Sequence, residues 1–160
     1  WLQLPPFFGP GRLRELVDAL GGAPAGMNVG VELRHPDWFQ SRRLHPDAFR
    51  ALNDLGVASV ITDVAGRRDV CHASLTAART LIRFVGNELH PTDHRRADDW
   101  VARAARWLAA GAEAVELIVH QPGDLLSPRV AAYLEEALCR AGIDPRPPPA
   151  PDPDGQLSLL

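Results

Sequence analysis

Short runs of apolar and β-branched residues alternate along the chain with segments of helical periodicity. Five of the runs are short enough to be strands, and they lie at residues 2–4, 28–34, 57–62, 80–86 and 114–120. Between and after them, apolar residues recur at spacings of three and four, which places them on one face of a helix. This alternation predicts an α/β protein with a mostly parallel sheet.

The apolar helical stripes fall in four segments, around residues 13–20, 48–55, 100–108 and 130–141. In the second segment, Pro46 suits the first helical position and Gly56 the C-terminal cap. Residues 63–79 have a weaker pattern, which predicts a short helix at most.

The composition is that of one folded domain, because 46% of the 160 residues are apolar and 23% are charged. All 17 basic residues are arginine, so catalysis through a Schiff-base lysine and phosphate binding through a Walker-type lysine are both excluded. The net charge of -3 gives no overall attraction to nucleic acid or to an anionic membrane. A role on DNA would therefore need a local cluster of arginines.

The two cysteines, Cys71 and Cys139, lie far apart in the sequence and form no CxxC pair. Neither a disulfide framework nor a four-ligand zinc site is indicated, and a reducing cytoplasm fits best. No apolar stretch approaches the length of about 18 residues that a membrane span requires, so no membrane partner is expected.

The composition changes abruptly at Asp144, because six of residues 144–155 are proline. Such a segment can neither form a helix nor bury a core, which predicts a domain over residues 1–143 and a disordered, proline-rich linker over 144–155. The last five residues, QLSLL at 156–160, form a third segment.

Candidate chemistry gathers at the predicted strand ends, where parallel α/β folds place their functional side chains. We expect Glu32, Asp63 and His120 to be the catalytic groups, as bases, acids or ligands of a divalent metal ion. Each also has a structural alternative: an ion pair of Glu32 with Arg34, a turn cap for Asp63, and a satisfied core histidine for His120.

Further polar and aromatic side chains at the same strand ends are expected to contact the substrate: Arg34, His35, Trp38, Arg83, Asn87 and Gln121. Arg34 and Arg83 are suited to grip a phosphate or carboxylate group. Trp38 suits stacking on a sugar or base, or alternatively filling the end of a barrel. The loop at 87–93 and the pair Arg67-Arg68 are candidates for a lid and an anion site, or else a solvated surface.

Four segments occur in a fixed order: VELRHPDWF at 31–39, TDVAGRRDVCH at 62–72, RFVGNELHPTD at 83–93 and VHQPGDLLSP at 119–128. With them the chain resembles the domain of unknown function 72 family, also called YecE-like, over roughly residues 1–141. The resemblance implies a TIM-like β/α barrel, without the family's first barrel strands and without a settled activity. Such a barrel typically has eight strands and about 250 residues, so we expect a partial barrel of about five β/α units.

The segment QLSLL resembles the short motif with which bacterial proteins bind the sliding clamp, although the usual terminal phenylalanine is leucine here. The expected contacts are Gln156 through its amide and Leu157, Leu159 and Leu160 through burial. Alternatively, the segment folds back on its own domain.

Two functions of different classes follow from these features. The first is a TIM-barrel hydrolase, assisted by a metal ion or not, that acts on a phosphate- or carboxylate-bearing substrate with a link to DNA metabolism. The second is a non-catalytic binding module recruited to the sliding clamp.

Overall fold

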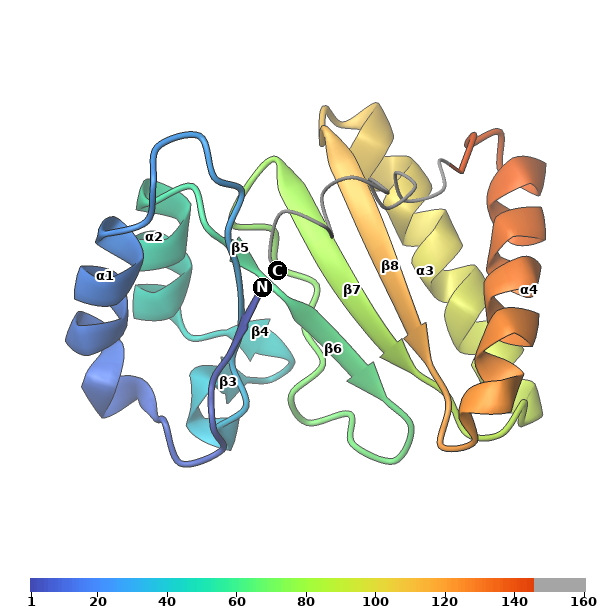
Figure 1. Ribbon diagram of the computed structural model, residues 1–160, viewed down its shortest axis with the longest axis horizontal. Helices are drawn as coiled ribbons and strands as arrows, with labels where there is room; N and C mark the ends of the chain where they lie inside the picture. Colours follow the sequence, from blue (N-terminus) through green and yellow to red (C-terminus); the bar gives the residue numbers. More distant parts are fainter. Residues whose placement is uncertain (146–160) are drawn as a thin grey trace, which may run out of the picture.

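The computed structural model describes residues 1–145 and contains two three-stranded parallel sheets. The first has the order β1 (Leu2–Gln3), β2 (Gly30–Glu32) and β5 (Ala58–Ser59). The second has the order β6 (Ile61–Val64), β7 (Arg79–Val85) and β8 (Ala114–His120). Figure 1 shows the strands crossing the molecule between two pairs of helices.

The two sheets meet within the run predicted as one strand at 57–62. The amide groups of Ala58 and Val60 donate to the carbonyl groups of Val29 and Val31, whereas from Ile61 onward the chain pairs with β7. The run is thus divided into β5 and β6 at Val60 because its two halves have different neighbours. The strand β2 is also shorter than the predicted 28–34.

The helices lie in the predicted segments: α1 (Leu13–Gly21), α2 (Pro46–Asp54), α3 (Pro91–Ala109) and α4 (Ser127–Arg140). Single 3-10 turns precede or separate these elements: η1 (Pro10–Arg12), η2 (Pro36–Trp38) and η3 (Asp124–Leu126). Pro46 and Pro91 each stand at the first helical position, where the missing N–H costs no hydrogen bond. None of these helices is long and apolar enough to cross a membrane.

One element of the fold was not expected from the sequence. An antiparallel hairpin of β3 (Phe39–Gln40) and β4 (Arg43–Leu44) follows η2, and its two turn residues, Ser41 and Arg42, have positive φ values. These residues lack the Asn-Gly signal of such turns, so the hairpin was not predicted. The segment from 65 to 78 contains no helix and joins β6 to β7 as an irregular connection.

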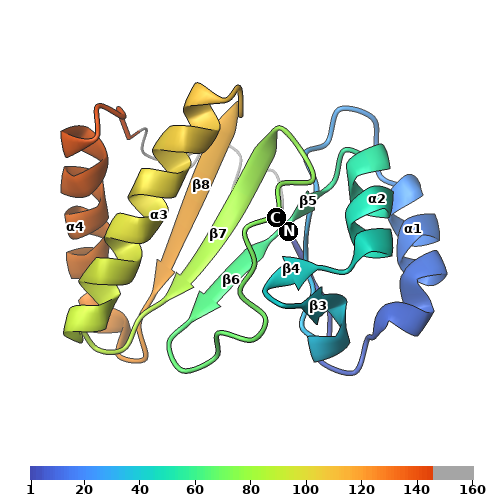
Figure 2. The same ribbon diagram turned by 180° about the vertical axis from the view of Figure 1, so that it is seen from behind.

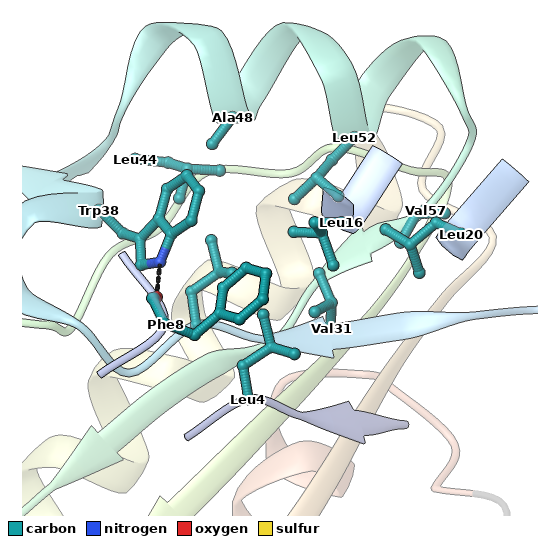
Figure 3. Packing of buried hydrophobic residues seen from close by; sticks show 11 residues of the cluster. Leu4, Phe8, Leu16, Leu20, Val31, Trp38, Leu44, Ala48, Leu52 and Val57 are labelled. Carbon is teal, nitrogen blue, oxygen red and sulfur yellow. Dashed lines mark hydrogen bonds between the residues drawn. The ribbon is translucent and has the colours of Figure 1, made fainter. Parts of the chain in front are cut away.

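Each pair of helices covers its own hydrophobic core. The first core joins α1 and α2 to Val31 of β2, and the indole N–H of Trp38 donates to the carbonyl of Phe8 at 2.7 Å within it (Figure 3). The second core joins α3 and α4 to β6, β7 and β8, through Ile61, Ile82 and Phe84 among others. Figure 2 shows α3 lying in front of β8, with α4 beside α3.

The strands therefore have a helix face, which carries these cores, and an opposite face, which we call the open face. Side chains alternate between the two faces along a strand. Because Val31, Ile61 and Phe84 belong to the cores, the neighbouring residues Glu32, Thr62 and Arg83 point to the open face.

Candidate functional site

The buried carboxylate of Glu32 and the guanidinium of Arg83 form an ion pair on the open face. Nη1 of Arg83 lies 3.5 Å from Oε1 of Glu32, and the indole N–H of Trp1 donates to Oε2 at 3.2 Å. The Glu32 side chain is 1% exposed and that of Arg83 is 27% exposed. Arg83, and not Arg34 as the sequence suggested, is thus the partner of Glu32, because strand pairing brings β7 to this side.

Around this pair lies a small pocket of about 40 Å³ at the carboxyl ends of β2 and β6. Its polar lining consists of Glu32, Arg34, Thr62, Arg67 and Arg83. The hydroxyl of Thr62 is buried and has no hydrogen-bond partner within residues 1–145. The pocket thus combines one carboxylate, three guanidinium groups and an unpaired hydroxyl.

The arginines of this pocket differ in their contacts. Arg67 donates through Nη2 to the carbonyl of Arg34 at 3.2 Å and lies 3.7 Å from the carboxylate of Asp69. The guanidinium of Arg34 has no ion pair or hydrogen bond in the part of the chain that the structure describes. Arg34 is therefore available to a ligand without the loss of an existing contact.

Asp63 lies on the other side of the sheet, beneath α3. Its fully buried carboxylate accepts from the indole N–H of Trp100 at 2.6 Å and pairs with Arg68. Nε of Arg96 lies 3.6 Å from the same carboxylate. Asp63 thus holds a helix and a loop against the sheet, and the structure does not place it with Glu32.

A second buried carboxylate, that of Asp93 in α3, shapes the loop after β7. It accepts from the backbone N–H of Asn87 at 2.7 Å, and the side-chain oxygen of Gln121 accepts from the N–H of Glu88 at 2.8 Å. Glu88 and Leu89 both have positive φ values. Gln121, predicted to contact substrate, is instead fully buried and supports this loop, whereas Asn87 remains exposed.

The structure does not assemble the metal site predicted from Glu32, Asp63 and His120. Glu32 and Asp63 occupy opposite faces, and Nδ1 of His120 lies 3.1 Å from the carboxylate of Asp124 on the exposed end of β8. Within residues 1–145, no three His, Cys, Asp or Glu side chains lie together as metal ligands require. His120 shares the open face with Arg83, because it pairs with Val85, two residues after Arg83.

Two residues predicted to contact the substrate, Trp38 and His35, instead support the fold. Trp38 is fully buried in the first core, where its ring offers no surface for stacking on a ligand. The Nδ1 atom of His35 accepts from the backbone N–H of Asp37 and so caps η2.

A buried histidine that the sequence analysis did not select lies beside β5. The Nδ1 atom of His72 accepts from the N–H of Ser74, so Nε2 carries the proton and faces Ser59 and the Val60 carbonyl. In this tautomer His72 is no base for the Ser59 hydroxyl. Burial lowers the pKa of His72 to about 4.

A cavity of about 670 Å³ lies toward the amino ends of the strands and is lined by Trp1, Gly30, Arg79 and Glu116 among others. It is larger than the pocket at Glu32, yet ligand sites of parallel α/β folds lie at the carboxyl ends. We therefore take the smaller pocket at Glu32, and not the larger cavity, as the candidate ligand site.

The family model described as "Protein of unknown function DUF72" matches residues 1–154. The chain belongs to this DUF72 family. It is 33% identical over 156 residues to the UPF0759 protein YecE of Escherichia coli K12 and to that of E. coli O157:H7. The match covers 86% of this chain and 57% of each relative, so the chain spans little more than half of their length.

Two crystal structures of a DUF72 protein from Enterococcus faecalis V583 share the fold of this DUF72 chain. One aligns with a TM-score of 0.66 at 16% identity, over 86% of this chain and 59% of that protein. The other has a TM-score of 0.63 at 15% identity and covers 94% and 61%. The structural similarity confirms a mixed α/β fold with parallel strands.

Of the residues predicted for the DUF72 site, Glu32, Arg34 and Arg83 lie together at one pocket. Thr62, which lines the same pocket, was missed, although its position directly before Asp63 on a predicted strand was a usable signal. The predicted clamp contacts Gln156, Leu157, Leu159 and Leu160 lie outside the described residues, as does the linker from residue 146 onward.

Proposed function

We propose that this DUF72 chain is part of a β/α barrel whose open face hydrolyses a small ligand that carries a phosphate or carboxylate group. The order of its strands supports the barrel, because the parallel strands lie side by side in the order in which they follow one another along the chain. That order is β1, β2, the run of β5 and β6, β7 and β8. In barrels of this type the open face becomes the interior, and the carboxyl ends of the strands hold the site.

The observation that carries the proposal is the pocket in which Glu32, Arg34 and Arg83 meet. The arginines bind an anionic substrate beside Glu32, and a carboxylate in this position acts as a general base. Glu32 accepts a proton from water, and the water oxygen forms a bond to the phosphorus of a phosphate ester or to the carbonyl carbon of a carboxylate ester. The bond from that atom to the leaving oxygen breaks, and the leaving oxygen takes up a proton. His120 supplies that proton from the same face of the sheet.

The proposal is tested by turnover of two simple probes, p-nitrophenyl phosphate and p-nitrophenyl acetate. Glu32→Gln removes the base, which lowers the rate by about 10²–10⁴-fold. Glu116→Gln is the matched control, because Glu116 is a carboxylate of the same face that pairs with Arg79 at 3.1 Å, away from the pocket. Equal rates for the wild type and Glu32→Gln would contradict the proposed role of Glu32.

A second proposal is that the chain is a non-catalytic binding module, which the segment QLSLL recruits to the bacterial sliding clamp. It is supported by the position of QLSLL at 156–160, just beyond the residues that the family model matches. The test is fluorescence anisotropy of the full chain and of a peptide of residues 150–160 with a bacterial clamp. Saturable binding that Gln156→Ala with Leu157→Ala abolishes supports the proposal, and binding unaffected by these changes contradicts it.

A reducing cytoplasm is proposed as the location, on the basis of the two cysteines. Both Cys71 and Cys139 are free, the first buried and the second exposed. An exposed free thiol is typical of proteins in a reducing compartment.

A further inference from the structure

The pocket at Glu32 has an excess of positive charge. One carboxylate faces three guanidinium groups, those of Arg34, Arg67 and Arg83. Glu32 is paired with Arg83, and the guanidinium of Arg34 has no partner within residues 1–145. Arg67 in turn lies 3.7 Å from the carboxylate of Asp69, so one positive charge is in surplus. A positively charged, partly closed site attracts a dianion more strongly than a monoanion.

The hydroxyl of Thr62 is a second observation, independent of charge. Thr62 is 7% exposed, lines the pocket, and its Oγ1 atom has no hydrogen-bond partner in the described part of the chain. Buried hydroxyl groups are nearly always hydrogen-bonded. An oxygen atom of a bound ligand would satisfy this group.

The placement of the polar donors on separate segments favours a phosphate group over a carboxylate group as the ligand. Arg34 follows β2, Thr62 lies in β6 and Arg83 lies in β7, so the donors reach the pocket from three separate segments. A planar carboxylate is matched by one guanidinium in a two-pronged contact. A tetrahedral phosphate group presents three outer oxygens in different directions, which suits donors on three segments.

We infer that this pocket is a subsite for a dianionic phosphate group, bound by Arg34, Thr62 and Arg83. The inference rests on the proposed function in that it takes the open face as the ligand site, and it narrows the substrate to a phosphate ester. Arg67 adds positive charge, although its Nη2 atom already donates to the Arg34 carbonyl.

The test is calorimetric titration of the full chain with inorganic phosphate and with malonate, a dicarboxylate of similar charge. Phosphate is expected to bind at least about tenfold more tightly than malonate. Arg34→Gln weakens phosphate binding by about tenfold or more, since a hydrogen bond to a charged group is lost. Arg14→Gln is the matched control, because Arg14 is exposed on α1, and it leaves the affinity within about twofold.

The variant Thr62→Val tests the hydroxyl group separately from the stability of the fold. It replaces the hydroxyl by a methyl group of similar size, and no internal hydrogen bond of the described residues is lost. The melting temperature therefore stays the same or rises, whereas phosphate binds about fivefold more weakly. Equal affinities for phosphate and malonate, or an unchanged phosphate affinity in Thr62→Val, would overturn the inference.

Glu32→Gln separates this inference from the proposed hydrolysis. Removing the carboxylate tightens phosphate binding, because a negative charge leaves the pocket, while turnover of the probes falls by about 10²–10⁴-fold. Phosphate binding without turnover of either probe contradicts the hydrolysis and supports the subsite. Turnover of the acetate probe without phosphate binding contradicts the subsite and supports the hydrolysis.

Discussion

Gly86 and Gln121 are packed so closely that a Cβ atom on Gly86 would lie 2.0 Å from Nε2 of Gln121. The amide of Gln121 occupies this space because it accepts from the N–H of Glu88 and so holds the loop after β7. The φ value of Gly86 is not positive, so its backbone conformation does not require glycine. Glycine is needed there because a larger residue would collide with the Gln121 side chain.

Gly86→Ala is therefore expected to destabilise the protein by about 1–3 kcal/mol through overpacking. The measurement is urea unfolding, with Gly11→Ala as the control, because a Cβ on Gly11 would meet nothing within 4 Å. In the double variant with Gln121→Ser the two effects are less than additive, since the shorter side chain leaves room for the methyl group. Additive effects would contradict the contact.

Asp63→Asn tests whether Asp63 is structural. The change removes the carboxylate that pairs with Arg96 and Arg68 beneath α3 and leaves the buried Arg96 with Asp93 alone at 3.8 Å, and we expect a loss of about 3 kcal/mol in the free energy of unfolding. Asp69→Asn is the control, because Asp69 is 58% exposed in its pair with Arg67 and contributes little. A stable Asp63→Asn variant that has lost only activity would return Asp63 to the catalytic candidates.

Trp38→Phe removes the indole N–H that donates to the Phe8 carbonyl in the first core. The carbonyl is left unpaired in a buried place, and the smaller ring leaves a void, so the expected loss is about 2–3 kcal/mol. The loss is measured by chemical denaturation beside Trp107→Phe, where the partly buried indole makes no hydrogen bond among the described residues. A smaller loss at Trp38 than at Trp107 would argue against this core contact.

The buried His72 predicts how stability depends on pH. Burial lowers its pKa from 6.5 to about 4, partly offset by the hydrogen bond to the Val60 carbonyl. Between these pH values the unfolded chain binds the proton and the folded chain does not, so stability falls as the pH falls through this window, by about 3 kcal/mol in total.

The measurement is unfolding of the wild type and of His72→Phe at several pH values between 4 and 7. The phenylalanine keeps a ring beside Phe39, whose centroid lies 5.5 Å from that of His72. Carboxylates titrate in both proteins, so the difference between the two pH profiles isolates His72. Parallel profiles would show that His72 does not titrate in this window.

Local pattern determined much of this protein. The stripes of apolar residues predicted all four helices, the run 114–120 matches β8, and the four ordered segments identified the family. These features depend on neighbours in sequence: a period of about 3.6 residues for a helix, alternation for a strand, and proline and glycine at the ends.

Only the tertiary structure decided which polar groups meet. Glu32 and Asp63 both stand near the ends of predicted strands, but the register of β2, β6 and β7 sends the first to the open face and the second beneath α3. A shift of one residue in a strand exchanges its faces, and the sequence of a short strand does not state its register. The pairing of Glu32 with Arg83, 51 residues away, arises only when the strands are aligned in space.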